Sequence, residues 1–254
     1  MCLLALALGQ HPDYPVILIA NRDEFHSRPT QPLSHWQQPP GIIAGRDLQA
    51  GGTWLGAHTK GRFAALTNVR EPAFVAVDAP SRGGLVTDFL TSSLAPDQWQ
   101  EQLGDLNRWP GFNLLVATLP DRWWYLSNRA CARELTPGYY ALSNASLDTD
   151  WPKTRGLRDD LKRHLAAGDM ISRNELFNFL WDRGMPESKE LPDTGVGYEQ
   201  ETLLAPRFIV SPDYGTRSST VLTVHNSGHC ELIERTLNAS GSSIGEELVS
   251  FNLS

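Results

Sequence analysis

The chain opens with two short apolar runs separated by turn-forming residues. Residues 3–8 (LLALAL) are all apolar, and residues 16–20 (VILIA) are apolar and mostly β-branched. The connection GQHPDYP is rich in Gly, Pro and Asp, which favour turns. Two such runs indicate a β-hairpin buried on both faces. Because the start of its first strand lies opposite the end of its second, the hairpin predicts that Cys2 neighbours residues 21–24.

Similar periodicity along the rest of the chain predicts eight more strands and four helices. The strands are residues 53–58, 62–69, 112–118, 123–128, 139–143, 208–211, 219–225 and 230–236. The first two helices contain Leu85, Phe89, Leu90 and Leu94, and then Trp99, Leu103 and Leu106 after Pro96-Asp97. The last two contain Leu157, Leu161 and Leu165, and then Leu176, Phe179 and Leu180 after the capping box Ser172/Glu175.

The order of these elements predicts an α+β fold. Helices occur in pairs between runs of strands, whereas a parallel sheet needs strict alternation of strand and helix. This order favours two stacked, mostly antiparallel sheets covered on the outside by helices. Residues 184–205 are rich in Pro, Gly and acidic residues and predict a long surface loop, of the kind that often forms a lid or binding loop.

Composition narrows the classes of function. A net charge of −7 argues against a nucleic-acid partner recognised through its phosphates. No apolar run approaches the roughly 18 residues of a membrane span, and no positive charge precedes residues 3–8 as it would in a secretion signal. The cysteines Cys2, Cys131 and Cys230 are odd in number and lack metal-ligand spacing, which favours reduced thiols in a cytoplasmic protein without a metal site. We expect Cys131 and Cys230 to be packing residues.

Four polar residues, Asn21-Arg22-Asp23-Glu24, follow directly on the second apolar run. Charges at the end of a buried strand are costly unless they are paired. One interpretation is a strand-end turn whose charges are solvated or paired with one another. The other is a functional site, because the hairpin places these residues beside Cys2.

Cys2 carries a thiol, and it also carries the α-amine if Met1 is removed. An α-amine has a pKa of about 7.7–8.0 and can act as a general base near neutral pH. Thiol attack on an amide or ester carbonyl forms an oxyanion, which needs preorganised donors. In this hypothesis Arg22 lowers the thiol pKa, and Asp23 or Glu24 holds the ammonium group.

Other predicted strands also begin or end in polar residues. Asn68 and Arg70 follow the apolar residues 64–66, Asn144 follows the strand at 139–143, and Arg217 lies at the entrance of a late strand. Asn amides are good oxyanion donors, although each Asn taken alone is more typical of a turn.

Taken together, these segments closely resemble the NRDE family, the family of the transport and Golgi organisation protein two. The resemblance runs nearly end to end, which implies a single domain over residues 1–254. It rests on Cys2, residues 21–24 and the segments GGTWLG (51–56), GRFAALTNVREP (61–72), LSNASLDTDWPK (142–153) and TRSSTV (216–221). That family in turn resembles the cysteine branch of the N-terminal-nucleophile (Ntn) hydrolases, which implies a four-layer αββα sandwich.

The resemblance also implies roles for single residues. Cys2 takes the nucleophile position after loss of Met1. Asn21 and Glu24 align with an arginine and an aspartate of the hydrolases, so Arg22 and Asp23 are displaced by one residue, onto the other strand face. The remaining matches are Asn68 and Asn144 with the asparagines near the oxyanion hole, and Arg217 with a late arginine.

Two functions remain open at this point. The first is a thiol amidohydrolase or acyltransferase that acts on an amide or thioester bond of a small acylated metabolite and requires no cofactor. The second is non-enzymatic binding and trafficking of haem, as cargo, or of acyl-CoA or lipid-like ligands. In the second, Arg22, Arg70 and Arg217 pair with carboxylates or phosphates and Trp54 lines the pocket. A purely structural role leaves the polar strand ends unexplained.

Overall fold

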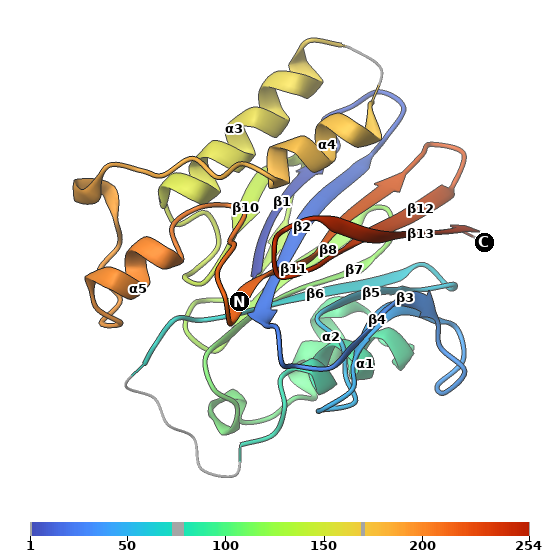
Figure 1. Cartoon of the computed structure of the whole chain (residues 1–254). Coiled ribbons are helices and arrows are strands. Elements are labelled where there is room, and N and C mark those ends of the chain that lie inside the picture. The colour runs from blue at the N-terminus through green and yellow to red at the C-terminus, as the bar shows by residue number, and fades with distance from the viewer. Residues whose placement is uncertain (1, 73–78, 169–170, 254) are drawn as a thin grey trace.

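The structure is a computed structural model that describes residues 2–72, 79–168 and 171–253. Two sheets stack face to face (Figure 1), and all the strand pairs within them are antiparallel. The first sheet has the order β10 (Gly138–Leu142), β1 (Cys2–Leu8), β2 (Val16–Phe25), β11 (Tyr214–Val224), β12 (His229–Leu237) and β13 (Ser243–Asn252). The second has the order β3 (Thr30–His35), β4 (Ile42–Asp47), β5 (Leu55–His58), β6 (Arg62–Asn68), β7 (Phe112–Thr118), β8 (Arg122–Ser127) and β9 (Arg133–Leu135).

Helices cover the outer face of each sheet (Figure 1). The helices α3 (Pro152–Ala166) and α4 (Arg173–Leu180) pack on the first sheet. The second sheet carries α1 (Gly83–Thr91) and α2 (Pro96–Glu101), followed by the 3₁₀ turn η1 (Leu106–Arg108). Between α4 and β11 lie the 3₁₀ turn η2 (Ser188–Glu190) and the short helix α5 (Tyr198–Leu203). Within the described residues, no helix combines the length and apolar composition that crossing a bilayer requires.

Three apolar clusters alternate with these four layers. One fills the space between the sheets, one lies under α1 and α2, and one lies under α3 and α4. Strand β1 shows how the sequence builds them, because successive side chains of a strand point to opposite faces. Its Leu4 and Leu6 lie in the cluster between the sheets, whereas Leu3 and Ala5 lie under the helices. The predicted αββα sandwich and the hairpin buried on both faces are therefore confirmed.

Several elements differ from the prediction. Residues 208–211 were expected to be a strand but form only an isolated bridge between Val210 and Gly215, because Pro206 and Pro212 flank them. Helix α4 buries Phe177 rather than Phe179, and α1 and α2 end before Leu94, Leu103 and Leu106. The predicted loop at 184–205 contains η2 and α5. The strands β3, β4, β9 and β13 lack a clear apolar alternation and were missed.

Candidate active site

The hairpin register fixes the surroundings of Cys2. Cys2 pairs with Arg22 and Leu3 pairs with Asn21. The neighbouring residues on the same face as Cys2 and Arg22, such as Leu4 and Ala20, lie in the cluster between the sheets. The Cys2 thiol and the Arg22 side chain therefore share the face that points toward the second sheet. This confirms the predicted neighbourhood and places Arg22, rather than Asn21, beside the thiol.

A cavity of about 330 Å³ opens at this end of the two sheets. Six of the predicted site residues line it, namely Cys2, Arg22, Asp23, Glu24, Trp54 and Asn68. Three further charged residues that sequence reasoning missed also line it, namely Arg28, Asp47 and Arg82. They come from the β2–β3 turn, the end of β4 and the residue before α1, and the one sequence signal among them is the spacing of four between Glu24 and Arg28.

Arg22 is 5% exposed and is held from two sides. Its guanidinium lies 4.1 Å from the centre of the Trp54 ring, and its Nη1 donates to Thr30 Oγ1 at 3.1 Å. A guanidinium stacked on an indole gains a cation–π attraction that strengthens when water is excluded. Trp54 therefore acts through Arg22 as well as forming a wall of the cavity.

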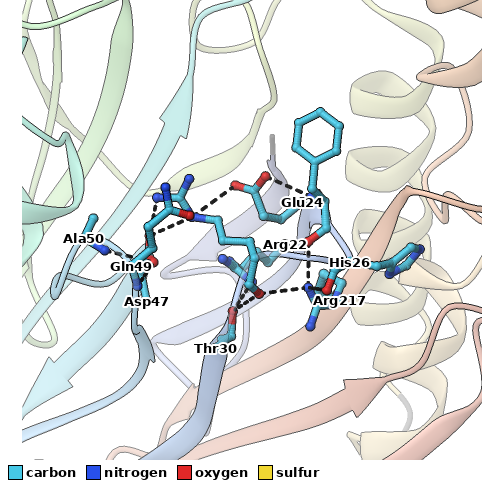
Figure 2. A network of polar contacts seen from close by, with 10 residues as sticks. Arg22, Glu24, His26, Thr30, Asp47, Gln49, Ala50 and Arg217 are labelled. Carbon is cyan, nitrogen blue, oxygen red and sulfur yellow. Dashed lines mark hydrogen bonds and ion pairs between the residues drawn. The ribbon is translucent and has the colours of Figure 1, made fainter.

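Figure 2 shows a network of polar contacts that includes Arg22, Glu24 and Asp47, all of which line the cavity. Arg28 donates from Nε and Nη2 to Asp47 Oδ2 at 2.9 and 2.6 Å, and its Nε lies 3.9 Å from Glu24 Oε2. The other Asp47 oxygen accepts from the backbone N–H groups of Gln49 and Ala50. Burial acts to raise the pKa of Asp47, but these hydrogen bonds outweigh that effect and lower it. Asp47 therefore orders the turn that leads to the GGTWLG segment.

Arg217 supports this network through the backbone of the β2–β3 turn. Its Nη1 donates to the backbone carbonyls of Phe25, His26 and Arg28 at 2.8, 3.3 and 3.3 Å (Figure 2). The side chain holds the β2–β3 turn and does not line the cavity. Its predicted position in the pocket is wrong, because a strand entrance fixes where a residue lies but not where a long side chain points.

Asn21 and Asp23 are buried on the helix side of β2. The Asn21 amide donates to the carbonyls of Leu180 and Arg207, both at 2.8 Å, and accepts from Ser219 Oγ at 2.6 Å. Asn21 therefore fixes the end of α4 and does not touch the cavity. Asp23 accepts from Thr216 Oγ1 at 2.8 Å and reaches the cavity at its rim. Burial raises the pKa of Asp23, while the positive charges of Lys153 and Arg22 act to lower it.

The two predicted oxyanion asparagines have different surroundings. Asn144 is buried and donates through Nδ2 to the Asn68 carbonyl at 2.9 Å. Ser143 Oγ bonds both Asn144 Oδ1 at 3.1 Å and the Cys2 carbonyl at 3.0 Å, so this group fixes the backbone around the thiol. The Asn68 side chain lines the cavity and forms no hydrogen bond to any described residue. Among the described residues, the Asn68 amide therefore has no hydrogen-bond partner, unlike that of Asn144.

Arg70 lies in a separate buried cluster near α5. Its Nη1 is paired with Glu201, and its guanidinium lies 4.9 Å from the centre of the Trp151 ring. Lys153 lies in the same cluster and donates to the Leu204 carbonyl at 2.9 Å. Burial lowers the pKa of Lys153 to about 8, and the charge of Arg70 acts in the same direction. The predicted place of Arg70 in the Cys2 pocket is therefore wrong.

The three thiols also differ. Burial raises the pKa of the Cys2 thiol, and the charge of Arg22 acts to lower it, as predicted, without offsetting burial. Cys230 packs in the core as predicted, and burial raises its pKa to about 12. Cys131 is exposed, contrary to prediction. No group of three or more His, Cys, Asp or Glu side chains in the described part of the chain is placed to hold a metal ion.

The four layers define the class of fold. A solved structure of a conjugated bile acid hydrolase from Clostridium perfringens aligns over 100% of this chain and 97% of its own, with a TM-score of 0.54. At 10% identity this likeness shows the fold alone.

The chain belongs to the Transport and Golgi organisation 2 family, whose model matches residues 1–239. A Transport and Golgi organization 2 homolog from Mus musculus is 32% identical, and one from Homo sapiens is 33% identical. Each alignment covers 93% of both chains. The Drosophila melanogaster protein is 27% identical over 93% of this chain and 92% of its own.

Proposed function

We propose that the protein is an N-terminal cysteine hydrolase or acyltransferase that acts on an amide or thioester bond of a small acylated metabolite. The observation that carries this proposal is the position of Cys2. Cys2 lines the 330 Å³ cavity opposite Arg22, together with Asn68, whose amide forms no hydrogen bond to any described residue. A nucleophile, a cation and an oxyanion donor thus line one small space.

The first half of the reaction transfers the acyl group to Cys2. The raised thiol pKa means that a base must take the proton during attack, and the α-amine of Cys2 supplies one once Met1 is removed. The Sγ atom bonds to the carbonyl carbon as its proton passes to the amine. The C–N or C–S bond of the substrate then breaks, and the proton moves to the leaving amine or thiol. Asn68 donates to the oxyanion that forms in between.

The second half releases the acyl group. The amine takes a proton from water, or from an acceptor amine or thiol, which attacks the thioester carbonyl. The bond to Sγ breaks and the thiol regains its proton. Asp23 lines the cavity near Cys2 and is the carboxylate we assign to holding the ammonium form of the amine. No cofactor takes part in this sequence.

Substitution of Cys2 tests the proposal. Cys2→Ala should lose essentially all turnover of a panel of acyl amides and acyl thioesters, because no second nucleophile replaces the thiol. Cys131→Ser is the matched control, since this exposed thiol lies outside the cavity. A wild-type protein that turns over no member of the panel, or a Cys2→Ala variant with wild-type turnover, contradicts catalysis at Cys2.

The second candidate function is binding and trafficking of haem, acyl-CoA or a lipid-like ligand without turnover. It is supported by the three arginines in the cavity wall, Arg22, Arg28 and Arg82, and by the Trp54 ring. In this case Cys2→Ala should retain binding within several-fold, as measured by absorbance titration of haem or calorimetry of acyl-CoA. Loss of binding in Arg22→Ala by about 1.5–3 kcal/mol would support an anionic ligand in this cavity.

A further inference from the structure

The charges that line the Cys2 cavity are unevenly paired. Three acidic side chains line it: Glu24 and Asp47 pair with Arg28, and Asp23 accepts from Thr216 Oγ1. Arg22 and Arg82 make no ion pair with any described residue. Arg22 donates to a threonine hydroxyl, and Arg82 Nη1 donates to the Gly111 carbonyl at 2.9 Å. Among the described residues, these two cavity-lining guanidinium groups therefore donate hydrogen bonds only to neutral acceptors.

Glu71, an acidic residue whose charge acts on Arg82, is bound by other groups. Glu71 accepts from Arg129 Nε and Nη2 at 2.7 and 2.8 Å, and from the Gly111 N–H at 2.7 Å. Both of its oxygens are thus used by these partners. The charge of Glu71 therefore acts on Arg82 at a distance, and no ion pair joins the two side chains.

The local backbone holds Arg82 at the cavity. Arg82 is the residue before α1, and Gly52 of the GGTWLG segment packs so closely on Gly83 that a Cβ on Gly52 would lie 2.6 Å from the Gly83 carbonyl carbon. The first turn of α1 contains no acidic residue and has no side-chain cap. The positive end of the helix therefore adds to the field of the two arginines.

We propose that Arg22 and Arg82 form a subsite for an oxyanion group, a carboxylate or phosphate, on the molecule that reacts at Cys2. This inference rests on the proposed function for the identity of that molecule as a substrate. Burial raises the free-energy cost of an unpaired guanidinium, and two oxygens of a carboxylate or phosphate can accept from its N–H groups. The substrates expected are acylated metabolites that carry a negative charge close to the bond that is cleaved.

Alkylation of Cys2 tests the subsite without any turnover. Iodoacetate carries a carboxylate and iodoacetamide does not, and both react with the same thiolate. The rate with iodoacetate divided by the rate with iodoacetamide therefore reports the electrostatic field at the thiol. In Arg82→Gln this ratio at Cys2 should fall by about three-fold or more, and in Arg82→Lys it should stay close to wild type. The exposed Cys131 serves as the internal reference, and Arg122→Gln, at an exposed arginine paired with Asp97, is the control variant.

A ratio at Cys2 that is the same in wild type and Arg82→Gln overturns the proposal. Protection of Cys2 by acetate but not by inorganic phosphate, or the reverse, identifies which oxyanion the subsite takes. If Cys2 reacts with neither reagent, the melting temperature decides: phosphate or acetate should raise it in wild type and not in Arg82→Gln. An equal rise in both proteins, or none in either, also overturns the proposal. If the protein passes these tests but shows no turnover, the subsite is supported and the proposed catalysis is contradicted.

Discussion

At the scale of single residues, opposing effects set the state of the Cys2 thiol. Burial raises its pKa, the charge of Asp23 adds to the increase, and the charge of Arg22 reduces it. A protonated thiol is a weak nucleophile, so reactivity here requires a base close to the sulfur. In the proposed mechanism the α-amine of Cys2 is this base, so the mechanism requires removal of Met1.

Replacement of Arg22 should make this thiol still harder to ionise. In Arg22→Gln we expect the apparent pKa of Cys2 to rise above its wild-type value, because the positive charge of its cross-strand neighbour is lost. The measurement is the rate of iodoacetamide labelling at Cys2 as a function of pH. A midpoint that is unchanged or moves to lower pH would show that Arg22 does not act on the thiol.

The two asparagines offer a matched pair of substitutions. Asn68→Ala should lower kcat by about 10²–10³-fold, as for the loss of an oxyanion donor, with little change in stability because its side chain forms no hydrogen bond to described residues. Asn144→Ala should mainly lower the unfolding free energy, by about 1–3 kcal/mol, since it leaves buried partners unsatisfied. Steady-state kinetics and urea unfolding separate the two, and a reversed pattern would contradict the assignment.

How far single residues could be predicted depends on what fixes their side chains. Arg22 could be placed beside Cys2 because hairpin pairing sets both position and face. Arg70 and Arg217 were misplaced because a long side chain beyond a strand end can point several ways. Arg82 was missed because it lies outside every predicted strand and is brought to the cavity by packing of Gly83 on Gly52.

At the scale of elements, Glu234 links the two sheets. It lies on β12, is 3% exposed, and accepts from the Leu33 N–H of β3 at 2.8 Å. Burial raises its pKa from 4.5 to about 7, while its hydrogen bonds and the charge of Arg22 act to lower it. The folded protein therefore binds this proton more tightly than the unfolded chain does.

Stability should fall as this carboxyl ionises. A raised folded-state pKa gives stability that is complete below the unfolded value, near pH 4.5, and is lost as the pH rises to about 7. Between pH 5 and pH 8, the unfolding free energy of wild type should drop relative to Glu234→Gln by up to about 3 kcal/mol. Urea unfolding of both proteins at the two pH values measures this, and a constant difference would contradict it.

Two glycines test the contact between the GGTWLG segment and α1. A Cβ on Gly52 would lie 2.6 and 2.8 Å from the backbone carbon and oxygen of Gly83, so Gly52→Ala should destabilise the protein by about 1–3 kcal/mol. Gly84 lies in α1 with no heavy atom within 4 Å of a new Cβ, so Gly84→Ala should stabilise it by about 0.4–1 kcal/mol. Thermal unfolding gives both values, and a Gly52→Ala variant as stable as wild type would contradict this contact.

Apolar patterning predicted those elements that bury at least one face. Strand β7 has the predicted bounds, and β6 and β12 differ from prediction by one residue at one or both ends. Strand β13 was missed because most of its side chains are exposed and it adds to the sheet edge through backbone pairing with β12. Helix α5 was missed because its six residues show too little periodicity, and the buried pair of Glu201 with Arg70 holds it in place.

At the scale of the whole molecule, the αββα sandwich places the Cys2 cavity where the two sheets meet. The apolar cluster between the sheets ends at Cys2, and residues from both sheets, together with the residue before α1, close the cavity above it. Order of elements and family resemblance were sufficient to predict this architecture. They were not sufficient to predict the cavity, because its walls come from turns far apart in sequence.

The most direct test of the central claim is mass spectrometry of the native protein before and after incubation with an acyl thioester. The account predicts that Met1 is absent and that an acyl group appears on Cys2, removable by hydroxylamine and missing in Cys2→Ala. Retention of Met1 on the native protein, or acylation of Cys131 with Cys2 left unmodified, would contradict it.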